Sequence, residues 1–95
     1  MARFYDRDLL NLELLAKRGS KEILYALVDK KGMKFTELRE LVGSPTTASQ
    51  RLQALMDLEL IKRDVQADQY RTVIYSLTEK GIRVVKLMKE LEHST

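Results

Sequence analysis

The fold depends on the stretch from Ser44 to Ile61, S-P-T-T-A-S-Q-R-L-Q-A-L-M-D-L-E-L-I. Its leading serine is a favourable helix N-cap, and the proline after it fits the first turn, where a missing N–H costs nothing. Ala48, Leu52 and Leu55 form an apolar stripe, which predicts that one side of this helix is buried. The other side carries hydroxyl, amide and guanidinium groups, which suit a nucleic-acid groove.

The neighbouring segments predict the order of a winged helix. A short helix over residues 36–42 comes first, and the turn after it is so brief that the two helices must cross steeply. Two alternating runs follow, Ile61 to Val65 and Thr72 to Leu77, and each fits a half-buried antiparallel strand. The connection between them is polar and lacks glycine and proline, so we expect a flexible tip.

The remaining segments predict further helices. Leucines are dense between Asp8 and Arg18, Ser20 is expected to cap the next helix, and Thr36 is expected to cap the short one. Met33 to Phe35 can form a short edge strand against the hairpin, and Thr78 with Glu79 opens a final helix. The order is therefore helix, helix, short strand, helix, helix, strand, strand, helix.

This order predicts an α+β fold, a winged helix-turn-helix with extra N- and C-terminal helices and a small antiparallel sheet. At 95 residues and 44% hydrophobic content, the chain fits one domain over residues 1–95, with terminal helices at 1–18 and 79–95.

Composition excludes several classes of function. The chain has no cysteine and one histidine, His93, so thiol sites and the usual zinc or nucleophile–histidine constellations are excluded. Paired carboxylates lie on charged helix faces and do not resemble a catalytic pair. We therefore expect no enzymatic activity, no cofactor and no metal. Neither a signal peptide nor an apolar run of ~20 residues is visible, so a cytoplasmic protein is expected.

Charge permits a polyanionic partner without identifying one. The formal net charge is +3 and the sequence pI is about 9.3. Glutamine and arginine can present paired groups to base edges, threonine offers a methyl against thymine, and hydroxyls near a helix start can bind phosphate. Cations and a tyrosine at the hairpin tip suit phosphates or the minor groove. The candidate DNA-contacting residues are Ser44, Thr46, Thr47, Ser49, Gln50, Arg51, Gln53, Arg63, Gln69, Tyr70 and Arg71.

Each of these sets also has an ordinary structural interpretation, as a solvated helix face and a solubilising hairpin. The order of the elements favours the DNA-binding interpretation for the helix. Asp64 and Asp68 weaken the positive potential of the hairpin, so we expect it to position the protein more than to specify sequence. Arg63 lies within the alternation of its strand, which also allows it to pack against neighbouring residues.

The two terminal helices carry more apolar residues than one core-facing stripe needs. They can either complete a single core or pair two copies of the chain, and the size of the surplus favours pairing. A two-fold dimer would present two reading helices to half-sites about one helical turn apart. The candidate dimer-interface residues are Leu9, Leu12, Val84, Leu87, Met88 and Leu91.

From Lys34 to Gly81 the chain resembles the HxlR-type winged-helix transcriptional regulators and their archaeal relatives. The likeness lies in K-F-T-E-L-R-E-L at 34–41, S-x-x-x-A-S-Q-R-L-x-x-L at 44–55 and R-T-V-I-Y-S-L-T-E-K-G at 71–81. Together these segments are fairly specific for winged-helix regulators, and less specific for this family over the MarR and ArsR groups.

The resemblance implies a homodimeric DNA-binding regulator, with the outward residues of the 44–58 helix near the major groove and Arg71 in the wing. Thr46 stands where many relatives carry lysine, and Glu59 where a glycine often ends the recognition helix. Either Glu59 adopts a left-handed conformation, which costs ~1 kcal/mol, or the chain leaves this helix in a different way. The N-terminal cysteine that some members use for redox sensing is missing, which excludes that mode.

We therefore expect a dimeric regulator that binds a specific sequence in double-stranded DNA, with repression as its simplest output. Two alternatives stay open. One is a winged helix used for protein–protein contact in a transcription complex or another assembly. The other is a nonspecific DNA-coating protein, which would favour a more basic surface.

Overall fold

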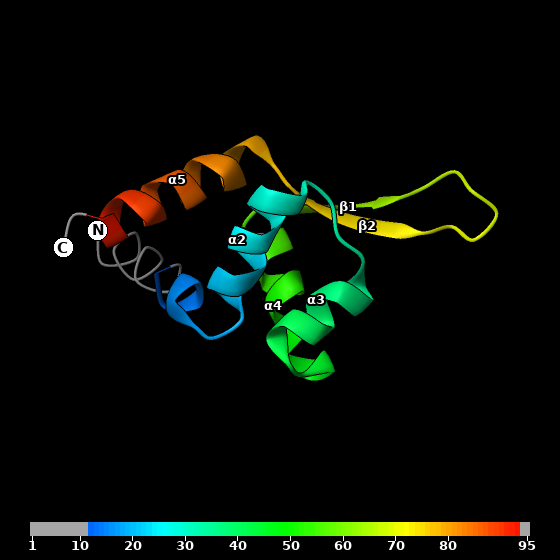
Figure 1. Cartoon of the computed structure of the whole chain (residues 1–95), viewed down its shortest axis with the longest axis horizontal. Coiled ribbons are helices and arrows are strands. Elements are labelled where there is room, and N and C mark those ends of the chain that lie inside the picture. The colour runs from blue at the N-terminus through cyan, green and yellow to red at the C-terminus, as the bar shows by residue number, and fades with distance from the viewer. Residues whose placement is uncertain (1–11, 94–95) are drawn as a thin grey trace.

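The computed structural model describes residues 12–93, and it confirms the predicted winged helix-turn-helix. A helical segment at residues 12–16 precedes the labelled elements in Figure 1. Those elements are α2 (Ser20–Lys30), α3 (Phe35–Val42), α4 (Pro45–Asp57), β1 (Ile61–Val65), β2 (Val73–Leu77) and α5 (Glu79–His93). The wing, formed by β1 and β2, and α5 extend in opposite directions from the helical body (Figure 1).

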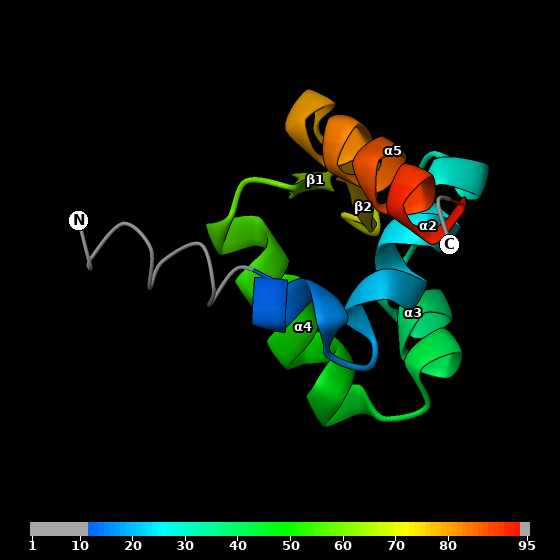
Figure 2. The same ribbon diagram turned by 90° about the vertical axis from the view of Figure 1, so that its left-hand side faces the viewer.

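The core is built around α2, which lies between α5 and the pair formed by α3 and α4 (Figure 1 and Figure 2). The predicted stripe of α4 is buried here, because Ala48, Leu52 and Leu55 are each at most 2% exposed. Burial of such side chains is worth about 1.5–3 kcal/mol each, and it fixes which face of α4 remains outside. The core residues from the other elements are Ile23, Leu24, Leu27, Met33, Leu38, Val42, Leu60, Ile61 and Val85.

The wing is a two-stranded antiparallel sheet whose register runs from Ile61 opposite Leu77 to Val65 opposite Val73. The predicted edge strand at residues 33–35 is reduced to a single bridge, because Phe35 already belongs to α3. In this bridge Met33 and Tyr75 exchange two backbone hydrogen bonds of 2.9 and 2.8 Å. The predicted alternation of buried and exposed residues is wrong for most of the wing. In β1 only the first residue is buried, and β2 is half-buried throughout. The hairpin contacts the core through Ile61, Tyr75 and Leu77, and its outer part projects beyond the helical body, where there is no core to cover (Figure 1).

The C-terminal end of α4 contains Glu59 at a position where glycine is more usual. Glu59 has φ 62°, the left-handed conformation that was one of the two predicted outcomes. Its N–H donates to the Met56 carbonyl at 2.9 Å, and the Leu60 N–H donates to the Leu55 carbonyl at 3.0 Å. This is the Schellman pattern of helix termination, which glycine usually supplies without the steric cost of a side chain.

Residues at the start of α5 donate hydrogen bonds to three successive carbonyls at the end of α4, those of Leu58, Glu59 and Leu60. Lys80 Nζ donates to the Leu58 carbonyl at 2.9 Å, and the Thr78 hydroxyl donates to the Glu59 carbonyl at 2.6 Å. The Thr78 N–H donates to the Leu60 carbonyl at 3.0 Å. The Thr78 hydroxyl also accepts from the Gly81 N–H at 3.0 Å, which confirms it as the N-cap of α5.

The predicted N-cap of α2 is wrong by one residue and that of α3 by two, because the N-caps are Gly19 and Lys34. Ser20 is the first residue of α2, and α3 begins at Phe35, ahead of Thr36. In both helices a glutamate in the first turn accepts a hydrogen bond from the backbone N–H of the N-cap residue. Glu22 accepts from the Gly19 N–H at 3.1 Å, and Glu37 accepts from the Lys34 N–H at 3.0 Å. A glutamate at this position satisfies an orphan donor without help from a capping hydroxyl.

The wing tip, which we expected to be flexible, is closed by one carboxylate. Asp68 accepts from the Thr72 N–H at 3.0 Å and from the Thr72 hydroxyl at 2.9 Å. The Gln66 N–H bonds to the Thr72 carbonyl at 2.7 Å, and Arg71 takes a left-handed φ of 50°. An Asp side chain therefore orders a turn that contains neither glycine nor proline.

The far end of α5 is joined to α2 through an aromatic side chain. The Tyr25 hydroxyl donates to the Glu92 carboxylate, and this bond raises the pKa of Tyr25 to about 12. Lys21 pairs with the same carboxylate at 3.1 Å, while the Lys21 and Lys89 ammonium groups lie 5.5 and 5.3 Å from the centre of the tyrosine ring. Both ends of α5 are thus attached to the helical body.

We expect Gly81→Ala to lower the free energy of unfolding by about 3 kcal/mol. A Cβ at this position would lie 2.0 Å from the Leu60 carbonyl oxygen, so α5 would have to move away from the exit of α4. Gly43→Ala is the control. Gly43 has φ 90° and open space around it, so its substitution should lower the free energy of unfolding by about 1 kcal/mol through backbone strain alone. Denaturant unfolding measures both, and equal losses would contradict the close approach.

The wing tip should respond to acid. The pKa of Asp68 is held below its ordinary value of 3.8, chiefly by the Thr72 N–H and then by the Thr72 hydroxyl. Because the pKa of Asp68 is lower in the closed tip, the charged carboxylate stabilises that tip fully at pH values above the ordinary pKa. This stabilisation is lost as the pH falls through the lowered pKa. Following the Thr72 amide by NMR should give a midpoint below 3.8, and Thr72→Val should raise it. A midpoint of 3.8 or above in the unmodified chain would contradict this account.

Candidate nucleic-acid interface

The exposed face of α4 is the centre of the candidate interface. Thr46, Ser49, Gln50 and Gln53 are all exposed there, opposite the buried stripe. Thr47 is half-buried, and Ser44 is half-buried because its hydroxyl accepts from the Thr47 N–H at 3.3 Å. Ser44 is therefore the predicted N-cap of α4, and its hydroxyl is already partly used within the protein.

Arg51 lies on the flank of α4 and apart from these exposed residues. Its Nε donates to the Arg18 carbonyl at 3.1 Å, at the corner that precedes α2, and its side chain is half-buried. Gly19, with φ 96°, permits this approach, because a Cβ there would lie 3.3 Å from the Arg51 Cγ. Sequence reasoning grouped Arg51 with the groove-facing residues, whereas the structure turns it toward the N-terminal side of the protein.

Asp57 belongs to the exposed face, and sequence reasoning left it out of the site. The Gln53 Nε2 donates to the Asp57 carboxylate at 3.0 Å, one helical turn further on. The spacing of four residues was the available signal, because side chains at i and i+4 are neighbours on a helix.

The wing brings its side chains to the same side as α4. A hollow of about 230 Å³ is lined by Ser49 and Gln53 from α4 and by Arg63 and Tyr75 from the two strands, with Phe35, Leu52 and Met56 beneath. Two of the predicted helix residues, Ser49 and Gln53, thus share one concave surface with Arg63. Arg63 is exposed, so the hollow leaves its guanidinium accessible to a ligand.

The tip of the wing extends this surface. Gln69, Tyr70 and Arg71 are exposed, and Tyr70 is 80% exposed. Asp68 stays within the tip as the acceptor for Thr72, and its lowered pKa keeps it charged at neutral pH. The wing therefore presents cations with two carboxylates among them, Asp64 on β1 and Asp68 at the tip, which suits phosphate contact more than base recognition.

The candidate dimer residues divide into two groups. Leu12, Leu87 and Leu91 are between 60% and 68% exposed. Val84 and Met88 are half-buried and pack against the core of their own chain, so they are less available to a partner. Leu9 lies outside the described residues. Ile82, which is not among the candidate dimer-interface residues, is also 54% exposed.

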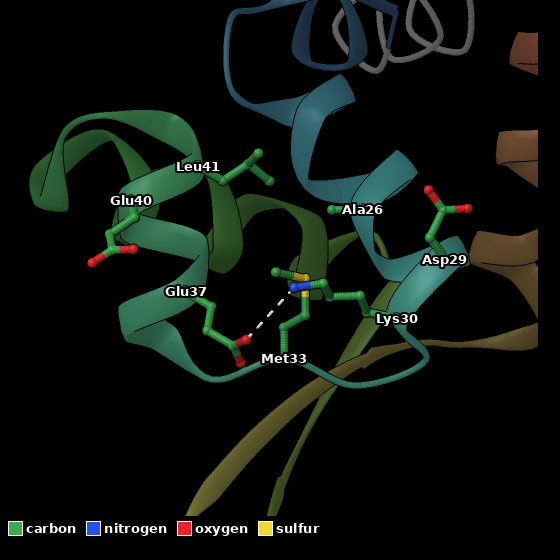
Figure 3. Close-up of a pocket in the computed structure, with 7 residues that line it drawn as sticks. All are labelled: Ala26, Asp29, Lys30, Met33, Glu37, Glu40 and Leu41. Atoms are coloured by element: carbon green, nitrogen blue, oxygen red, sulfur yellow. Dashed lines mark ion pairs between the residues drawn. The ribbon is translucent and has the colours of Figure 1, made fainter.

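A larger hollow of about 470 Å³ opens between α2 and α3 (Figure 3). Leu41 is 44% exposed and points across it toward α2, while Lys30 reaches Glu37 at 3.9 Å. The other charged residues that line it are Asp29 and Glu40. Three carboxylates against one ammonium would repel a phosphate backbone, so this face does not belong to the DNA interface.

Residues 12–93 contain neither a membrane-spanning helix nor a cluster of metal-binding side chains. No helix there is both long and apolar enough to cross a membrane. Within the same residues, no three histidine, aspartate or glutamate side chains come together as metal ligands would.

Known proteins share this arrangement. A family model described as HxlR-like helix-turn-helix matches residues 14–94. The HTH-type transcriptional regulator YodB of Bacillus subtilis is 32% identical over 81 residues, covering 83% of this chain and 71% of YodB.

Solved structures agree with the sequence comparison. Diamide-treated YodB from B. subtilis superposes with a TM-score of 0.78 at 31% identity, covering 85% of this chain and 81% of that one. The ytfH protein of Salmonella typhimurium superposes with a TM-score of 0.75 at 30% identity, covering 93% and 78% of the two chains. The matching family consists of regulators and not of enzymes. This chain belongs to the HxlR-like helix-turn-helix family of transcriptional regulators.

Proposed function

We propose that the protein is a homodimeric repressor that binds a specific sequence in double-stranded DNA through α4 and the wing. Membership of its family makes it a DNA-binding transcriptional regulator. The dimeric state, the contacting residues and the direction of regulation are our proposal. In this view residues 1–95 act as one winged-helix domain, in the cytoplasm, where a bacterial chromosome is accessible.

The concave surface shared by α4 and the wing is the observation that supports this proposal most strongly. Hydroxyl and amide groups of α4 lie beside the guanidinium of Arg63 on it. A helix with such side chains fits a major groove, and a neighbouring cation fits the phosphates beside that groove. A module that only contacts proteins has no need for this pairing of groups.

The exposed leucines support pairing of two copies. Leu12 and Leu87 are 61% and 60% exposed, which is costly for large apolar side chains on a lone protein. A two-fold dimer through the terminal helices would cover them and place two copies of α4 on one face of a duplex. A dimer seated across a promoter blocks polymerase, and this is the simplest route to repression.

Selection of bound duplexes from a random pool tests the function. We expect a motif with two half-sites about 10 base pairs apart, centre to centre. Placing that motif over a promoter should reduce transcription in vitro when the protein is added. Binding without an enriched motif would indicate a coating protein, and no binding would indicate a protein-contact module. Either result would contradict our proposal.

Gln50→Ala should weaken binding to the selected site about tenfold, since a good amide contact to a base edge contributes about 1–3 kcal/mol. Binding to unrelated duplex should stay the same. Glu90→Gln, on the exposed part of α5, is the control and should bind the selected site as the unmodified chain does. An equal loss on both kinds of duplex would mean that Gln50 does not read sequence.

Leu87→Asp should give a monomer in sedimentation, because it places a charge within the proposed interface. Affinity for the paired half-sites should fall about 100-fold, as binding of both halves at once is lost. Leu41→Asp is the matched control, since Leu41 is 44% exposed but lies on α3. A dimer that persists in Leu87→Asp would place the interface elsewhere.

A further inference from the structure

The exposed face of α4 carries no cation, although arginine or lysine against guanine is the commonest specific contact in a major groove. All of α4 lies within the described residues. The residues that share this face at helical spacing are Thr46, Ser49, Gln50, Gln53 and Asp57, and all five are exposed. The face therefore offers hydroxyls, two amides and one carboxylate.

Arg51 is the one basic residue of α4, and the structure takes it away from this face. It follows Gln50 by one residue, which turns it about 100° around the helix. Its Nε is already bonded to the Arg18 carbonyl, and its stem packs near Gly19. The Nε edge of its guanidinium is thus engaged at the corner before α2, away from the exposed face of α4.

Gln53 has a defined orientation because its partner can only accept. A charged carboxylate has no hydrogen to donate, so the Gln53 Nε2 must face Asp57. When the Nε2 hydrogen that points away from Oε1 makes this bond, the Oε1 and the second Nε2 hydrogen are left side by side as an acceptor and a donor. Adenine presents the complementary donor and acceptor at N6 and N7, whereas guanine presents two acceptors at O6 and N7.

We infer that α4 selects A·T base pairs in the major groove beneath it, that Gln53 reads adenine, and that Asp57 is a positioning residue that orients Gln53. Thr46 adds a methyl group that can pack against the thymine methyl. This inference rests on the proposed function and specifies the DNA that the site accepts. Guanine is disfavoured because its usual reader is absent from this face and a carboxylate lies at its end.

Selection from a random duplex pool with the full chain and with Gln53→Ala tests the base preference. The position that relaxes in Gln53→Ala is the one that this side chain reads, and we expect adenine there. Exchanging that A·T pair for G·C should weaken binding of the unmodified chain about tenfold or more. A clear motif with G·C at this position would overturn the inference and leave the proposed function intact. No motif at all would overturn both.

The role of Asp57 is tested by the ratio of affinities for the A·T and G·C duplexes. Asp57→Ala should lower this ratio at least threefold, while Asp57→Glu, which keeps an acceptor, should preserve most of it. A merely structural or electrostatic role would change binding to both duplexes by the same factor and leave the ratio unchanged. Asp64→Ala, on β1, is the control for removing a negative charge, and we expect its ratio to equal that of the unmodified chain. An unchanged ratio in Asp57→Ala would overturn the positioning role.

Discussion

The arrangement of this protein depends on the three carbonyls at the exit of α4, from Leu58 to Leu60, which are bound by Thr78 and Lys80 at the start of α5. A helix end leaves such acceptors unpaired, and here the next helix supplies their donors. Because β1 begins one residue after Leu60, the same contacts set the direction of the wing relative to α4. Gly81 is needed for the same reason, since only a residue without a side chain fits against the Leu60 carbonyl. The reading helix, the wing and the helix proposed for dimerisation are thus joined at one point.

Local patterns were enough to predict the elements and the buried side of α4. Helical spacing identified Ala48, Leu52 and Leu55 as core, and the Ser44 cap followed from residue preference. The features that were predicted wrongly depend on contacts between distant segments or on which of several local acceptors binds an N–H at a helix start. Arg51 is turned aside by a carbonyl 33 residues away, which no periodicity records. The wing alternates in sequence but not in burial, because it projects past the core that its alternation would cover.

The attachments of α5 suggest how pairing and DNA binding can be connected. Its first turn holds the exit of α4, and its far end holds α2 through Tyr25 and Glu92. A partner bound to α5 would contact a helix that is attached to the protein at both ends. A movement of α5 would then be transmitted to α4 through the Thr78 contacts. YodB has been solved in diamide-treated and reduced forms, whereas this chain has no cysteine and cannot use thiol oxidation. Changes in its DNA affinity must come through other contacts.

In the proposed interface, the wing supplies most of the affinity for DNA and α4 supplies the sequence preference. The cations of the proposed interface belong to the wing, at Lys62, Arg63 and Arg71, while the exposed face of α4 is neutral apart from Asp57. Phosphate contacts by the wing would supply most of the salt-dependent attraction, which carries little information about sequence. The amides and hydroxyls of α4 add little attraction of their own, but they penalise a base edge that leaves them unpaired. A protein with only a small positive charge can thus be selective, because its discrimination arises from unsatisfied hydrogen bonds at wrong sites more than from strong attraction at the right one.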